Sequence, residues 1–209
     1  MTYFGFLALF LGIPIAVLAG LNWWDERRQR PLPAAFRTLP VGFVLVLHIM
    51  IALVYTTPWD NYLVATGVWW YDEALVTGLT IGWVPIEEYT FFVVQPIFTG
   101  LWLFYWLKRL PVAPVGRWED TYLRRSLVTV AFSIWLITVT MLATGWQPGT
   151  YLALELGWAA VPLMLQFAFG GDILWRYRRQ LAVAIIPPTL YLAFADALAI
   201  QSGTWTIDP

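Results

Sequence analysis

The sequence predicts an all-α transmembrane protein whose helices are built from a parallel internal repeat. Three observations support this fold class. Of the 209 residues, 60% are hydrophobic and only 12% are charged, a composition typical of membrane proteins. The hydrophobic residues gather in six long apolar stretches. All 12 lysines and arginines fall between the stretches, and only in alternate intervals.

Each apolar stretch can cross a bilayer as a helix, which takes about 20 residues. Their apolar character is uninterrupted, whereas the strands of a membrane barrel would alternate apolar and polar residues. The first stretch follows no basic segment and contains no clear cleavage site, so we expect a retained span rather than a signal peptide. The predicted spans are residues 2–22, 39–57, 85–107, 127–144, 151–170 and 181–200.

The basic residues predict the orientation of the chain. With six spans, the three intervals that carry them lie on one side of the membrane. Basic loops favour the cytoplasmic side, so we expect a multi-pass protein of the cell membrane with both termini outside. The residues are Arg27, Arg28, Arg30 and Arg37 in the first basic loop, Lys108, Arg109, Arg117, Arg124 and Arg125 in the second, and Arg176, Arg178 and Arg179 in the third.

An internal repeat divides the chain. A pattern of aspartate, glycine, tryptophan and aspartate follows the second span and returns after the sixth, and a Trp-x2-Arg-Arg-Gln pattern ends the first and fifth spans. We therefore expect a first repeat of three spans over 1–110, a connector span over 111–150 and a second repeat of two spans over 151–209. This is a 3+1+2 arrangement, and a complete duplication would be 3+1+3. The matching residues are Asp60, Gly67, Trp69 and Asp72 in one copy and Asp196, Gly203, Trp205 and Asp208 in the other.

Two adjacent glutamates begin the third span. Pro85 suits a helix start, and negative charge is favoured there. Glu88 shares a helix face with Phe91, Phe92 and Gln95, while Glu87 lies about 100° away. Ionisable groups in a membrane span usually face a protein interior or a cavity. Two interpretations stay open: both glutamates cap the helix at the interface, or one of them acts as an acid or base.

Other polar residues could join the same interior. Asp60 and Asp196 occupy equivalent places in the repeat, as structural helix-end groups or as part of a cavity. Glu155 begins the fifth span, and Gln166 follows three helical turns later on nearly the same face. We expect Glu155 to face inward, with either a structural or a cavity role.

Composition also excludes several kinds of site. With no cysteine and one histidine, the chain offers neither thiolate metal ligands nor a histidine-rich metal centre. It contains no Gly-x-Gly-x-x-Gly or Gly-Lys-Ser/Thr loop that would cradle a nucleotide. The net charge of −1 gives no reason to expect a nucleic-acid partner. We therefore predict no metal and no cofactor.

Taken together, the motifs resemble those of the membrane-embedded lycopene cyclases, a family with heterodimeric and fused members in bacteria, archaea and fungi. The resemblance extends over nearly the whole chain. It rests on Pro85-Ile86-Glu87-Glu88 with Phe91-Phe92 and Gln95-Pro96, on Pro58-Trp59-Asp60-Asn61 with Gly67-Val68-Trp69-Trp70, on Phe169-Gly170-Gly171-Asp172, and on Ala195-Asp196-Ala197 with Gly203-Thr204-Trp205.

This resemblance implies a lycopene beta-cyclase, which converts the ψ-ends of lycopene into β-ionone rings through a carbocation, without net oxidation or reduction. We expect Glu87 or Glu88 to supply and recover the protons, because apolar surroundings disfavour the charged form of a carboxyl group. Aromatic faces would stabilise the cation. The substrate would enter from the membrane lipids. The residues expected to bind it are Phe91, Phe92, Gln95, Asp60, Trp69, Glu155, Gln166, Asp196 and Trp205.

The chain departs from the family pattern at one point. Fused members carry a second Pro-x-Glu-Glu-type span, whereas this sequence ends before it. Three explanations stay open: a truncated chain, a helix supplied by a second cyclase subunit, and an enzyme that works without it. Whether the chain also forms a homo-oligomer stays open as well. The alternative functions are a C50 or ε-type carotenoid cyclase and a small transporter of the 3+1+3 kind.

Overall fold

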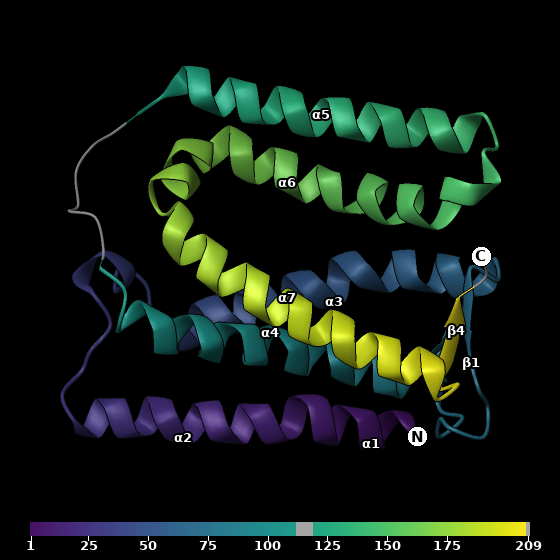
Figure 1. Cartoon of the computed structure of the whole chain (residues 1–209), viewed down its shortest axis with the longest axis horizontal. Coiled ribbons are helices and arrows are strands. Elements are labelled where there is room, and N and C mark those ends of the chain that lie inside the picture. Colours follow the sequence, from purple (N-terminus) through teal and green to yellow (C-terminus); the bar gives the residue numbers. More distant parts are fainter. Residues whose placement is uncertain (112–118, 208–209) are drawn as a thin grey trace. The chain divides into compact units, whose positions relative to one another are not determined.

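A computed structural model describes residues 1–111 and 119–207. Within them, six helical segments are long and apolar enough to cross a membrane, as predicted (Figure 1). The first segment, Tyr3–Arg27, is continuous through α1 (Tyr3–Leu7), a π-helical turn η1 (Ala8–Gly12) and α2 (Ile13–Arg27). The other five are α3 (Val41–Ala65), α4 (Ile86–Leu107), α5 (Thr121–Ala143), α6 (Thr150–Arg176) and α7 (Arg178–Gln201). Short 3-10 turns, η2 (Ala34–Phe36) and η3 (Gln147–Gly149), occur between them.

Several helices are longer than predicted. Helix α3 continues past Pro58 to Ala65, so Asp60 lies inside it. Helix α5 starts earlier, because the carboxylate of Asp120 caps it by accepting the Leu123 N–H at 2.9 Å. Helix α6 continues through a bend at Gly170. Apolar composition alone locates the membrane-crossing part of a helix and not the polar turns that extend it.

The structure also contains two small antiparallel sheets, so the fold is not purely helical. Strand β1 (Trp69–Tyr71) pairs with β4 (Trp205–Ile207), and β2 (Thr80–Ile81) pairs with β3 (Val84–Pro85). In the first sheet Trp69 lies opposite Ile207, and Tyr71 lies opposite Trp205. The two Gly-x-Trp segments of the predicted repeat are therefore hydrogen-bonded to each other.

The ends of α3 and α7 close in the same way. At the end of α3, the amides of residues 66, 67 and 68 donate to the carbonyls of residues 62, 64 and 63. At the end of α7, the amides of residues 202, 203 and 204 donate to the carbonyls of residues 198, 200 and 199. Gly67 and Gly203 adopt φ values of 75° and 71°, which a glycine adopts without steric cost. This likeness is local, and the duplication of whole repeats stays a prediction; Asp208 lies outside the described residues.

The described residues form two compact units. Residues 1–111 and 179–207 make the first, which contains α1, α2, α3, α4, α7 and both sheets. Its main core packs Phe6 and Leu11 of the first segment against Phe98 of α4 and Ala195 of α7. Sequentially distant α7 thus belongs with the first three spans.

Helices α5 and α6 make the second unit and run side by side in opposite directions (Figure 1). Asp172 is fully buried and forms a 2.7 Å salt bridge with Arg124. The Asp172 carboxylate also accepts the Asp120 N–H at 3.0 Å. This network fixes the register of the two helices near one end of the pair.

Candidate active site

Glu88 lies in the first turn of α4, where the first span and strand β1 meet that helix. Its Oε2 accepts hydrogen bonds from the hydroxyl groups of Tyr3 and Tyr71, the latter at 3.0 Å. Among the described residues, no lysine or arginine forms a salt bridge with Glu88. The carboxyl group is therefore held by two neutral donors.

Tyr3 is fixed in place by its backbone and by its ring. Its N–H donates to the Leu75 carbonyl at 2.8 Å, which ties the start of α1 to the loop that leads to α4. Its side chain is 2% exposed. The ring stacks on Tyr71 with centroids 5.9 Å apart and packs against Trp205 at 5.0 Å. Both hydroxyl groups thus reach Glu88 from rings that support each other.

Two more carboxyl groups surround this centre. Asp196 of α7 is an electrostatic neighbour of Glu88, and its Oδ1 accepts the Trp205 Nε1–H at 3.0 Å. Asp60 of α3 is 2% exposed and is an electrostatic neighbour of Tyr3 and Tyr71. Helices α3, α4 and α7 therefore each contribute one carboxyl group to the surroundings of the two phenols.

Glu87 faces a different neighbourhood from Glu88. It is 1% exposed, and its Oε1 accepts the backbone N–H of Thr77 at 2.6 Å. Its Oε2 has no hydrogen-bond partner among the described residues. The interaction holds the loop between β1 and α4, and that loop also supplies the carbonyl that binds Tyr3.

The aromatic residues of the third span divide between two clusters. Phe92 is buried and packs with Tyr89 and Val84. Phe91 packs against this cluster and against the main core. Gln95 is half-buried, and its role stays a prediction.

In the β1–β4 sheet, Trp69 lies opposite Ile207, and Trp205 lies opposite Tyr71. The Trp205 ring also packs against the Tyr3 ring. The structure therefore brings Glu88, Asp60, Asp196 and both tryptophan-bearing strands to one end of the first unit.

Glu155 and Gln166 belong to the second unit, and their part in the site stays a prediction. Glu155 is half-buried in α6, and its Oε1 has no partner among the described residues, whereas Gln166 is exposed.

Sequence reasoning missed the two residues that bind Glu88. Tyr3 and Tyr71 lie 85 and 17 residues away from it in the sequence. Tyr71 belongs to the first Gly-x-Trp segment, which was the available signal, while Tyr3 stands among several aromatic residues of the first span.

The surroundings of Tyr71 favour the neutral form of its hydroxyl group, which can donate a hydrogen bond. Burial, and then the neighbouring Glu88 carboxylate, raise the pKa of the Tyr71 hydroxyl well above its ordinary value. The phenol therefore keeps its proton at physiological pH and can donate to Glu88 without interruption.

Comparison with known proteins identifies the family. The chain is 40% identical to the lycopene beta-cyclase of Halobacterium salinarum strain R1 over 214 residues, which cover 99% of this chain and 81% of that protein. It belongs to the lycopene beta-cyclase family. Membership confirms the resemblance drawn from the Pro85–Pro96 motif and places the protein among the cyclase enzymes of carotenoid biosynthesis.

The lycopene beta-cyclase family also has longer fungal relatives. The bifunctional lycopene cyclase/phytoene synthase of Blakeslea trispora is 27% identical over 99% of this chain, which spans 33% of that protein. The protein of the same name from Aspergillus oryzae is 34% identical over 77% of this chain and 27% of its own length. No family model matches the chain, and no solved structure matches it.

Proposed function

We propose that this cyclase converts the ψ-ends of lycopene into β-ionone rings and that Glu88 is the acid and the base of the reaction. The observation that carries the proposal is the environment of Glu88 in a member of this family. The group begins a membrane-spanning helix, binds two hydroxyl groups and makes no salt bridge among the described residues. A carboxyl group without a fixed cationic partner is suited to accept and release a proton.

The reaction consumes and returns one proton for each ring. Protonated Glu88 transfers its proton to C2 of the terminal alkene, which leaves a cation at C1. The C5–C6 double bond attacks C1, so that the C1–C6 bond forms and the charge moves to C5. Glu88, now a carboxylate, removes the proton from C6, and the C5–C6 double bond forms again. Repetition at the other end gives γ-carotene and then β-carotene.

Tyr3 and Tyr71 act as positioning residues in this scheme. Their hydroxyl groups orient the carboxylate after it has lost its proton, when hydrogen bonds to it are strongest. Their rings, with that of Trp205, form an aromatic wall beside Glu88. Such faces attract a carbocation through their π electrons.

Glu87 has a positioning role in the proposal. It fixes the loop that places Tyr3 and Tyr71, through the Thr77 amide and the contact between Leu75 and Tyr3. We assign Asp60 and Asp196 to the electrostatic surroundings of the centre, where their carboxyl oxygens would favour a developing cation.

The proposed orientation places the Glu88 centre near the outer face of the membrane. Thr204 donates its hydroxyl to the Met1 carbonyl at 2.8 Å, so the first residues and the end of α7 meet at the Glu88 end of the first unit. The basic residues Lys108 and Arg109 contact Asn22 and Asp25 at the other end. Basic residues favour the cytoplasmic side; Arg117 lies outside the described residues. Lycopene, which dissolves in lipid, would enter from the bilayer.

Pigment analysis in cells that accumulate lycopene tests the assignment. We expect wild-type protein to form β- and γ-carotene, Glu88→Gln to leave lycopene unchanged, and Glu87→Gln to keep most activity. Glu73→Gln is the matched control, because Glu73 is an exposed carboxyl group in the same loop region. Ring formation by Glu88→Gln at wild-type rate would refute the role of Glu88. Persistent lycopene with folded wild-type protein would refute the function if adding the missing Pro-x-Glu-Glu-type span as a separate peptide did not restore ring formation. Products with ε-rings or C50 products would indicate the alternative cyclases.

A further inference from the structure

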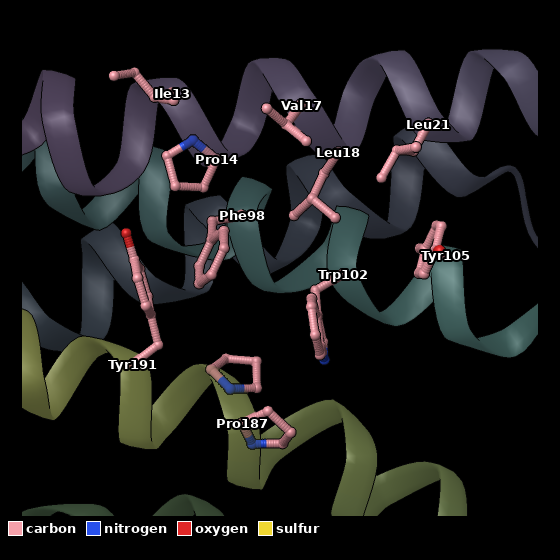
Figure 2. Close-up of a pocket in the computed structure, with 11 residues that line it drawn as sticks. Ile13, Pro14, Val17, Leu18, Leu21, Phe98, Trp102, Tyr105, Pro187 and Tyr191 are labelled. Atoms are coloured by element: carbon pink, nitrogen blue, oxygen red, sulfur yellow. The ribbon is translucent and has the colours of Figure 1, made fainter.

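The first unit contains an apolar cavity that is separate from the Glu88 centre. It has a volume of about 520 Å³ and lies between α2, α4 and α7 (Figure 2). In Figure 2, Leu18 of α2 extends toward the rings of Phe98 and Trp102 of α4. Pro187 and Tyr191 line it from α7. A cavity of this size is within the range that holds a small organic ligand.

Trp102 of α4 forms a hydrogen bond with the backbone of α7 beside Pro187. In a regular helix the Val183 carbonyl would accept the N–H of residue 187, but Pro187 has none. The indole Nε1–H of Trp102 donates to the Val183 carbonyl instead, at 2.8 Å. The side chain of one helix thus replaces the missing backbone donor of another.

Tyr191 makes the corresponding contact with the first span. The Phe10 carbonyl lies in the π-helical turn η1, four residues before Pro14, whose nitrogen carries no hydrogen. The Tyr191 hydroxyl donates to that carbonyl at 3.0 Å. Both Pro14 and Tyr191 line the cavity.

These two contacts make the wall apolar as well as rigid. Trp102 donates to the Val183 carbonyl, which Pro187 leaves without its helical donor, and Tyr191 donates to the Phe10 carbonyl, so each carbonyl is hydrogen-bonded. A pocket lined almost entirely by apolar groups suits an apolar ligand. The suitable occupant is therefore a hydrocarbon.

The cytoplasmic end of the cavity is closed by polar contacts between α2 and α4. Asn22 donates to the Leu101 carbonyl at 3.0 Å, and Lys108 donates to the Asn22 side chain at 3.1 Å. Tyr105, which lines the cavity, carries the Arg109 guanidinium 3.6 Å from its ring centroid. A ligand in the cavity therefore extends toward the Glu88 end rather than through this end.

The cavity and Glu88 share helix α4, and Trp102 lies about 40° from Glu88 around its axis. Phe98 and Trp102 lie within a third of a turn of Glu88 around α4, and Phe98 is about 15 Å from it along the axis. Phe98 and Tyr3 belong to one continuous hydrophobic core. A long chain anchored in the cavity can thus follow the helix toward the carboxyl group.

We propose that this cavity binds the conjugated chain of the carotenoid substrate while one ψ-end lies at Glu88, an inference that rests on the proposed function. The occupant is argued from shape. A polyene is flat and rigid, and it matches the planar rings of Phe98, Trp102, Tyr105 and Tyr191. A lipid tail would lose more conformational freedom on entering the same rigid walls. The cavity thereby selects a long conjugated chain and sets the distance from it to the reacting end.

Binding and turnover are separated by working in the Glu88→Gln background. Purified protein in nanodiscs is titrated with lycopene, and the induced circular dichroism of the bound polyene is measured. Leu21→Trp narrows the cavity from α2. Leu47→Trp is its matched control on α3, because Leu21 and Leu47 are 39% and 43% exposed and only Leu21 lines the cavity. Val17→Trp and Val46→Trp form a second pair, with the two valines 56% and 58% exposed.

We expect Glu88→Gln to bind lycopene, the cavity variants to weaken that binding roughly tenfold, and the α3 variants to leave it unchanged, a tenfold factor being about 1.4 kcal/mol. Melting temperatures identify variants that fail to fold. If Leu21→Trp or Leu47→Trp fails to fold, the comparison of Val17→Trp with Val46→Trp tests the proposal instead. Unchanged binding in folded Leu21→Trp and Val17→Trp would overturn the cavity proposal even if wild-type protein makes β-carotene. An equal loss in the α3 controls would overturn it as well. Intact binding by wild-type protein that forms no ring would instead contradict the proposed function.

Discussion

The two ends of the first unit hold a carboxyl group in opposite ways, one fully buried and one half-buried. Asp25, at the end of α2, is 1% exposed and makes two hydrogen bonds to the Arg109 guanidinium, at 2.7 and 2.8 Å. Glu88, at the start of α4, binds the hydroxyl groups of Tyr3 and Tyr71 and forms no salt bridge with any described residue. Glu88 connects α4 to the first span, and Asp25 connects the first span to Arg109, which follows α4.

This difference indicates which carboxyl group can take part in chemistry. A guanidinium partner keeps Asp25 ionised, and the same hydrogen bonds raise the pKa of Arg109. Such a pair joins two helices but cannot give up a proton. Hydroxyl partners can serve both the protonated and the ionised carboxyl group, so Glu88 can change state while its position is kept.

The largest expected effect separates the two groups by rate. Glu88→Gln should lower ring formation by a factor of about 10² to 10⁴, the usual range for loss of a general acid or base. Asp25→Asn should leave the rate per folded molecule near that of wild type. Initial rates with lycopene, normalised to folded protein, provide the measurement. Equal losses in both variants would show that the comparison is wrong.

Loss of the Asp25 carboxylate should lower the free energy of unfolding, although it leaves the rate of ring formation nearly unchanged. Asp25→Ala leaves the Arg109 charge without its partner, and we expect a loss of about 3 kcal/mol in unfolding free energy. Combining Asp25→Ala with Arg109→Ala should recover part of this loss, because no unpaired charge remains. Equilibrium unfolding of the single and double variants in detergent would measure both, and additive losses would argue against a coupled pair.

Removing either hydroxyl group should have an intermediate effect on rate. A hydrogen bond to a charged group contributes about 1.5 kcal/mol or more, so Tyr3→Phe and Tyr71→Phe should each slow ring formation by about tenfold. Tyr89→Phe is a suitable control, since its hydroxyl binds Asn61 and the Ile81 carbonyl rather than Glu88. Rates unaffected in both tyrosine variants would remove the positioning role.

Variants of Glu87 test whether this residue has a structural role, in contrast to the proposed catalytic role of Glu88. The amide oxygen of Glu87→Gln can still accept the Thr77 N–H, whereas Glu87→Ala cannot, and the alanine variant should be less stable by about 1 kcal/mol. Hydrogen exchange at Thr77 would report the loosened loop. Faster exchange in the glutamine variant than in the alanine variant would contradict this assignment.

The smallest expected effect concerns pH. Because the folded protein raises the pKa of Tyr71, the unfolded chain loses this proton first as the pH rises. The stabilisation is therefore complete below the ordinary tyrosine pKa of about 10 and is lost as the pH rises through the higher folded value. Unfolding experiments across this range should show the decline in wild-type protein and a weaker one in Tyr71→Phe.

The membrane-spanning helices could be predicted because apolar stretches long enough to cross a bilayer are visible in the sequence. Pro85 and the two glutamates likewise indicated the start of α4. The predicted end of the second span at residue 57 was too early, because Pro58 lies within α3. The short strands were missed, since three residues such as Trp69–Tyr71 form a strand only when a partner such as Trp205–Ile207 is present.

Family motifs named the glutamate pair but could not distinguish its members. Adjacent residues on a helix point about 100° apart, so the partners of Glu87 and Glu88 depend on which segments pack on each side. The Thr77 amide comes from the preceding loop, and the Tyr3 hydroxyl comes from the first span.

By itself, the sequence determined the membrane environment, the number of spans and the position of two carboxyl groups at a helix start, because these depend on the composition and type of neighbouring residues. Tertiary structure alone decided that Glu88 meets Tyr3, 85 residues away, and that Trp102 and Tyr191 donate to backbone carbonyl groups of other helices. Those contacts depend on how the helices of the first unit pack, and no local pattern in the chain specifies that packing.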